Sequence, residues 1–141
     1  MFRPRVSINR LVWIIAVLVM AISVYRYTNG VLITLGYRTG LLPLQSLPTE
    51  MQHWLPGIPL WQDVIYLAGY LGVIAALILL VSRRKAVLWM YGIAAGIAKI
   101  DWALLSPSPE PLAVLLGWSA FVQYFVILSL VILLRQRRFL H

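Results

Sequence analysis

Four apolar segments, each long enough to cross a lipid bilayer, dominate this sequence. An α-helix rises about 1.5 Å per residue and the hydrocarbon layer is about 30 Å thick, so one crossing needs roughly 20 apolar residues. Such segments lie at residues 8–27, 63–82, 86–105 and 111–134. The first reaches this length because Arg10 and Arg26 can extend toward opposite interfaces. We therefore predict an all-α membrane protein, a four-transmembrane-helix bundle that forms a single integral membrane domain over residues 1–141.

The composition supports this class. The chain is 62% hydrophobic and only 11% charged, and its mean hydropathy is +0.87, which is too apolar for an ordinary water-soluble domain. Its net charge of +8 comes from short basic clusters between apolar segments, so we expect no nucleic-acid partner. The absence of cysteine excludes disulfides and thiolate metal sites.

The basic clusters also predict the orientation. Loops rich in Lys and Arg stay in the cytoplasm. Nine of the twelve basic residues fall at the N-terminus, in the "SRRK" connection or at the C-terminus: Arg3, Arg5, Arg10, Arg83, Arg84, Lys85, Arg135, Arg137 and Arg138. We predict that both termini are cytoplasmic, in a bacterial cytoplasmic membrane. The N-terminal segment resembles a secretory signal, but we expect it to be retained as the first span.

The long outer loop, residues 28–62, is too apolar to extend freely into water. Pro48 can start a short helix in which Met51, Trp54 and Leu55 share one apolar face. We expect this helix to lie at the membrane interface, with Trp54 and Trp61 in the aromatic belt.

Small residues predict where the second and third spans pack. The "SRRK" connection is so short that these helices must be antiparallel neighbours. Gly92-x-x-x-Gly96 is a close-packing motif, and the second span carries a small-residue face that includes Ala68 and Gly72. We expect these two faces to meet.

The third span contains two charges, Lys99 and Asp101, near its outer end. On a helical wheel they point in different directions, and both can reach the outer interface. Lys99 either extends to that interface or joins a polar patch, for which Asp63, Ser119 and Gln123 are candidates. Asp63 is then its candidate ion-pair partner, and Asp101 joins Trp54 and Trp61 as a candidate docking residue.

Familiar catalytic patterns are missing from the sequence. There is no nucleophile–base–acid set, no glycine-rich phosphate loop and no HExxH helix. His53 lacks a second ligand at metal-binding spacing, so we interpret it as a surface residue. We expect neither a cofactor nor a metal. Catalysis remains open only through scattered residues such as Asp63, Lys99 and His53.

The region around residues 48–90 resembles small four-span bacterial membrane proteins, some labelled sugar transporters and others placed near DoxX-like proteins. The residues that carry the resemblance are Glu50, Gln52, Pro59, Trp61, Gly69, Gly72, Leu79, Leu80 and Arg83. The resemblance implies a transport label but transfers no functional residue.

Two functions remain in view. The first is a non-catalytic accessory or assembly subunit that docks onto a larger membrane complex through its spans and its outer loop. The second is a small oligomeric transporter of a solute or a lipid-linked sugar. The partners expected are the bilayer and either another membrane protein or further copies of this chain.

Overall fold

The computed structural model describes the backbone of residues 7–105 and 111–141 and the side chains of residues 7–49, 51–100 and 118–141. Within these ranges the chain is helical and contains no β-strand. The α-helices are α1 (Ile8–Arg38), α2 (Thr49–Trp54), α3 (Leu60–Val81), α4 (Val87–Leu105) and α5 (Pro111–Gln136). Short 3₁₀ turns at Leu44–Ser46 and Leu55–Gly57 flank α2.

Three of the described helical segments are long and apolar enough to cross a membrane: α1, α3 and residues 118–136 of α5. Residues 87–100 of α4 form a shorter apolar helix. Large apolar side chains such as Leu18, Leu71, Ile93 and Val122 are exposed on the outside of all four helices. This surface suits lipid, so the chain has the character of an integral membrane protein.

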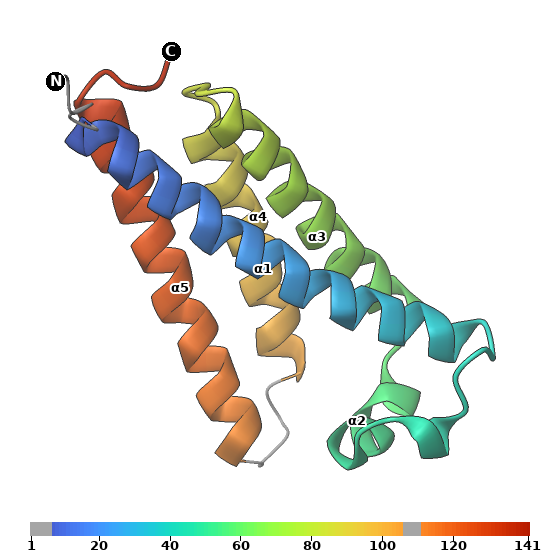
Figure 1. The fold of residues 1–141 in the computed structure, drawn as a ribbon. Helices are drawn as coiled ribbons and strands as arrows, with labels where there is room; N and C mark the ends of the chain where they lie inside the picture. Colours follow the sequence, from blue (N-terminus) through green and yellow to red (C-terminus); the bar gives the residue numbers. More distant parts are fainter. Residues whose placement is uncertain (1–6, 106–110) are drawn as a thin grey trace, which may run out of the picture.

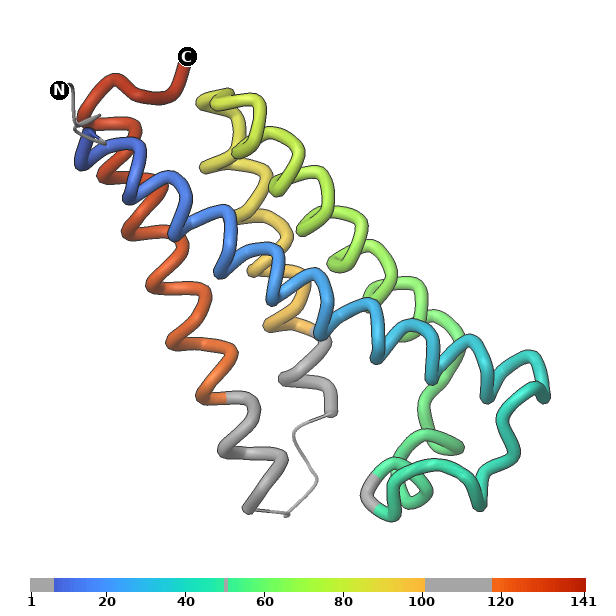
Figure 2. The backbone as a smooth tube through the Cα atoms, viewed as in Figure 1, coloured from blue at the N-terminus to red at the C-terminus, as the bar shows by residue number. Residues whose placement is uncertain are grey.

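The four long helices form one bundle (Figure 1). Helices α3 and α4 make the most extensive pair, α1 packs against both α3 and α5, and α4 also contacts α5. The start of α1 and the C-terminal residues lie at the same end as the α3–α4 turn, and α2 lies at the opposite end (Figure 2). We call residues 7–10, 82–86 and 135–141 the basic end, and residues 38–63 the loop end.

Helix α1 is longer than the sequence predicted. The first span was expected to end at residue 27, but the helix continues to Arg38 and has 31 residues, or about 46 Å. Residues 28–38 contain no proline, and buried Val31 gives this extension a contact with the bundle. The helix ends only where Gly40 adopts a φ of +76°. The outer loop is therefore shorter than the predicted 28–62.

The bounds of α3, α4 and α5 lie within three residues of the segments 63–82, 86–105 and 111–134. The short helix expected after Pro48 is also present as α2. Its apolar face turns toward the bundle: Leu55 is buried, and Met51 and Trp54 line a pocket with residues of α1 and α3.

The predicted glycine face of α4 is wrong. Gly92 and Gly96 are exposed, and a Cβ on either would meet nothing within 4 Å. Gly72 does lie at the α3–α4 contact, where an added Cβ would be 2.9 Å from the Cβ of Ala94, whereas Ala68 is exposed. The face that carries Tyr91 and Ala94 offers more area for van der Waals contact, which drives helix association in lipid. This face of α4 therefore packs against α3 in place of the face that carries Gly92 and Gly96.

The bundle core is concentrated toward the basic end. Met20 of α1, Val73 of α3, Tyr91 of α4 and Ile127 of α5 are all fully buried. Trp13 adds a cross-connection, since its indole Nε1 donates a hydrogen bond to the Leu80 carbonyl at 2.8 Å. These buried side chains therefore pack α1, α3, α4 and α5 together in the half of the bundle near the basic end.

Candidate functional site

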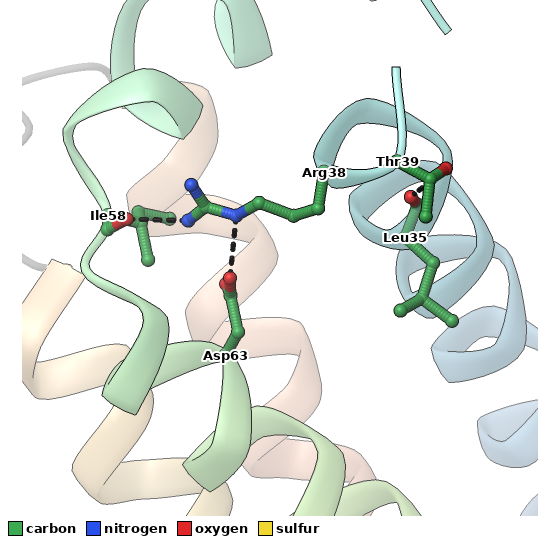
Figure 3. A network of polar contacts seen from close by, with 5 residues as sticks. All are labelled: Leu35, Arg38, Thr39, Ile58 and Asp63. Atoms are coloured by element: carbon green, nitrogen blue, oxygen red, sulfur yellow. Dashed lines mark hydrogen bonds and ion pairs between the residues drawn. The ribbon is translucent and has the colours of Figure 1, made fainter. Parts of the chain in front are cut away.

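Arg38, the last residue of α1, connects the segments of the loop end. Its Nε donates to Oδ2 of Asp63 at 2.7 Å, and a second guanidinium nitrogen donates to the Ile58 carbonyl (Figure 3). These contacts tie α1, the segment before α3 and the first turn of α3 together. Asp63 was a candidate ion-pair partner for Lys99, but in the structure it pairs with Arg38. Arg38 was missed because α1 was expected to end before it.

A pocket of about 80 Å³ lies beside this ion pair, between the loop end and the bundle. Its lining residues are Gly30, Thr34, Met51, Trp54, Ile58, Gln62, Asp63 and Tyr66. Trp54 was a candidate docking residue, but its side chain is partly buried and lines this pocket. Trp61 is 55% exposed and remains available on the surface. The side chain of Asp101, the third docking candidate, lies outside the described residues.

Tyrosines form an aromatic layer between α1 and α3. The ring of Tyr27 stacks on Tyr66 and on Tyr70, with centroids 5.0 and 6.1 Å away. The hydroxyls of Tyr70 and Thr28 lie 2.9 Å apart in a hydrogen bond. Sequence reasoning overlooked this layer, although the tyrosines of α3 stand four residues apart on one helical face.

Lys99 lies on the other side of the bundle, between α4 and α5. Its Nζ is 3.5 Å from the centroid of the Phe121 ring and 5.3 Å from that of Tyr124. Aromatic faces attract cations, and this attraction strengthens where water is excluded. The α5 rings therefore offer the ammonium group a favourable site within the apolar part of the protein.

Lys99 also borders a groove of about 170 Å³ between α4 and α5. The other lining residues are Ala95, Gly96, Phe121, Tyr124, Phe125 and Leu128. Gly96, expected to pack against α3, instead leaves space here because it has no side chain. The groove is thus lined by apolar side chains, and Lys99 is its single cationic lining residue among the described residues.

The remaining members of the predicted polar patch do not gather into one cluster. Gln123 of α5 donates from Nε2 to the Val19 carbonyl of α1 at 3.3 Å, so it connects two helices. Ser119 is exposed on α5. Asp63 is paired to Arg38 and is therefore apart from Lys99, which lies against the α5 rings.

No group of three or more His, Asp or Glu side chains that could hold a metal occurs among the described residues. His53 is exposed on α2, and His141 lies at the basic end. The site with the most distinctive chemistry in this part of the chain is therefore the α4–α5 groove. Comparisons with protein-family models, curated proteins and solved structures found no match to this chain.

Proposed function

We propose that this protein is a non-catalytic accessory subunit that crosses the membrane four times and docks onto a larger membrane complex. The observation that carries the proposal is the α4–α5 groove, with its apolar walls and its lysine. A second transmembrane helix could place a side chain in this groove, because packing between helices in lipid depends on close van der Waals contact.

The position of Lys99 supports a protein partner. It lies six residues before Leu105, the last residue of α4, or about 9 Å along the helix axis. Charged side chains within membrane helices commonly face other helices and pair with opposite charges. We therefore infer that the partner helix faces α4 at the level of Lys99.

Aromatic side chains on α5 extend the same surface. The ring centroids of Trp118 and Phe121 are 5.8 Å apart, and those of Phe121 and Phe125 are 6.4 Å apart. Trp118 is 59% exposed and Phe125 is 66% exposed. Large rigid aromatics often dominate the energy of an interface, so this ridge beside the groove suits a docking role.

Copurification tests the proposal with a matched pair of variants. Gly96→Leu places a side chain into the groove, whereas Gly92→Leu adds the same side chain on α4 at a position that does not line it. In mild detergent, the tagged wild-type protein and Gly92→Leu should retain a stoichiometric membrane-protein partner. Gly96→Leu should lose it without a drop in thermal stability. A partner retained equally by all three proteins would argue against docking at the groove.

A second candidate is a small oligomeric transporter of a lipid-linked sugar or another solute. The observation in its favour is the combination of Lys99 with the Phe121 and Tyr124 rings, since a cation and aromatic faces can also bind a phosphate and a sugar. A path through one chain would have to open the packed core around Met20 and Tyr91, which favours the subunit.

Lys99→Met distinguishes these candidates because it removes the charge and keeps an unbranched apolar side chain. For a subunit, the variant should lose its copurifying partner. For a transporter, wild-type protein alone in liposomes should move a labelled solute or lipid, and Lys99→Met should abolish the movement. Transport by the purified chain without any partner would overturn the subunit proposal.

A further inference from the structure

The C-terminal tail brings separate basic segments together at one end of the bundle. The backbone N–H of His141 donates to the Arg83 carbonyl at 2.7 Å, and the N–H of Lys85 donates to the His141 carbonyl at 2.8 Å. Leu140 is only 1% exposed and anchors the tail. The tail therefore lies along the α3–α4 turn, as the path of the chain in Figure 2 also indicates.

Further contacts attach the C-terminal tail and the α3–α4 turn to the start of α1. A guanidinium nitrogen of Arg137 donates to Oδ1 of Asn9 at 3.1 Å. The guanidinium of Arg83 lies 5.1 Å from the centroid of Trp13 and 4.6 Å from that of Phe139. Three basic segments that are remote in sequence thus form one surface.

The charged side chains of this surface are all basic. Six exposed basic side chains belong to it: Arg10, Arg84, Lys85, Arg135, Arg137 and Arg138. The four acidic residues of the whole chain are Glu50, Asp63, Asp101 and Glu110, and none belongs to the segments of the basic end. Like charges held this close repel one another, and an external anion would relieve the repulsion.

Two arginines adopt backbone conformations that glycine adopts more readily. Arg83 and Arg138 have φ values of 55° and 53°, and each follows the C-terminal cap of its helix. In both turns the next amide reaches back to the helix: Arg84 N–H bonds the Leu79 carbonyl at 2.8 Å, and Phe139 N–H bonds the Leu134 carbonyl at 3.0 Å. This arrangement is the Schellman motif. Both turns therefore place positive charge just beyond the ends of apolar helices.

We propose that the basic end binds the phosphate of anionic lipid headgroups. Exposed apolar side chains lie directly beside the charges, including Leu11 on α1, Val81 on α3 and Ile132 on α5. A phospholipid can place its phosphate among the arginines and its acyl chains along these helices, whereas a free phosphate would use only the first contact. Basic surfaces at the ends of membrane helices are well suited to this chemistry. The proposal does not depend on the function of the α4–α5 groove.

Native mass spectrometry of the full-length protein in a neutral detergent tests the site. Phosphatidylglycerol and phosphatidylcholine with identical acyl chains would be supplied at equal concentrations. Wild-type protein should retain phosphatidylglycerol preferentially, and Arg84→Gln/Arg135→Gln/Arg138→Gln should reduce that preference on the order of tenfold, since each nearby basic residue adds to the attraction. Arg26→Gln is the control, because Arg26 is exposed on α1 outside the basic end.

The substituted side chains are exposed, so the triple variant should unfold at the wild-type temperature without added lipid. If it does not fold, the single variants Arg84→Gln and Arg135→Gln should each show a partial loss of preference. Equal retention of both lipids by wild type, or an unchanged preference in the variants, would overturn the proposal. Full displacement of phosphatidylglycerol by inorganic phosphate would overturn the lipid assignment and indicate a site for the free ion.

Discussion

Arg38 shows how a single side chain can organise the loop end. It is the last residue of α1, and its guanidinium reaches both the Asp63 carboxylate of α3 and the Ile58 carbonyl just before that helix (Figure 3). Its side chain is 24% exposed and that of Asp63 is 20% exposed, so solvent weakens the pair only in part. One residue thereby supports the docking of the long α1 extension against α3.

Arg38→Gln should destabilise the protein by about 1–3 kcal/mol, because it removes a charge-assisted hydrogen bond and leaves Asp63 without its cation. Thermal unfolding of the purified protein in detergent measures the effect. Arg26→Gln, which removes an exposed arginine from the same helix, is the control and should unfold near the wild-type temperature. Equal unfolding temperatures for Arg38→Gln and the control would show that the pair adds no net stability.

For Lys99, the surroundings in the folded structure determine which groups its charge can contact. The charge was recognisable in the sequence, but its surroundings were not: it lies against Phe121 and Tyr124 of α5 and not with Asp63. Rings of α5, which the sequence alone did not associate with Lys99, therefore form part of its surroundings.

At the scale of the helices, the α3–α4 contact depends on one close approach. Gly72 and Ala94 leave no room for a larger side chain, since even a Cβ at Gly72 would lie 2.9 Å from that of Ala94. Both helices are apolar over most of their surface, so a small residue at the contact is what lets the backbones approach.

Gly72→Leu should therefore destabilise the bundle by about 1–3 kcal/mol through overpacking. The same substitution at Gly92, where a Cβ would meet nothing within 4 Å, should leave the unfolding temperature close to that of wild type. Gly72→Ala should be less harmful when combined with Ala94→Gly, because the pair exchanges the methyl group across the contact. An unperturbed Gly72→Leu protein would contradict this account of the interface.

At the scale of the whole molecule, the two ends differ in the charge of their side chains. The basic end combines the start of α1 and the C-terminal tail with the α3–α4 turn, and the loop end carries α2 and the Arg38–Asp63 pair. This polarity, together with the preference of basic loops for the cytoplasm, predicts that the loop end faces outward.

Cysteine labelling in intact cells tests this orientation, since the chain has no cysteine of its own. Ser46→Cys at the loop end should react with a membrane-impermeant maleimide, and Ser82→Cys in the α3–α4 turn should react only after permeabilisation. Both serines are exposed, so reactivity reports the side of the membrane. The reverse pattern would show that the protein has the opposite orientation. Labelling of both from outside would show that α3 does not cross the membrane between them.

The sequence was sufficient to predict where α3, α4 and α5 begin and end to within three residues. The stops around α3, α4 and α5 are local: a basic turn follows α3, and prolines precede α5. Within these three segments the backbone must satisfy its own hydrogen bonds wherever water is excluded, which favours a continuous helix. The short helix α2 was predictable for a similar reason, since Pro48 and the spacing of Met51 and Trp54 lie within a few residues of one another.

Which helix faces meet could not be read from the sequence. In a soluble bundle the apolar stripe identifies the inside, but these helices are apolar all round, so glycine spacing alone misassigned the face of α4. The extension of α1 to Arg38, the ion pair with Asp63 and the tail against Arg83 and Lys85 all depend on contacts between distant segments. Such contacts follow from how the helices rotate and cross, and only the packed tertiary structure specifies that.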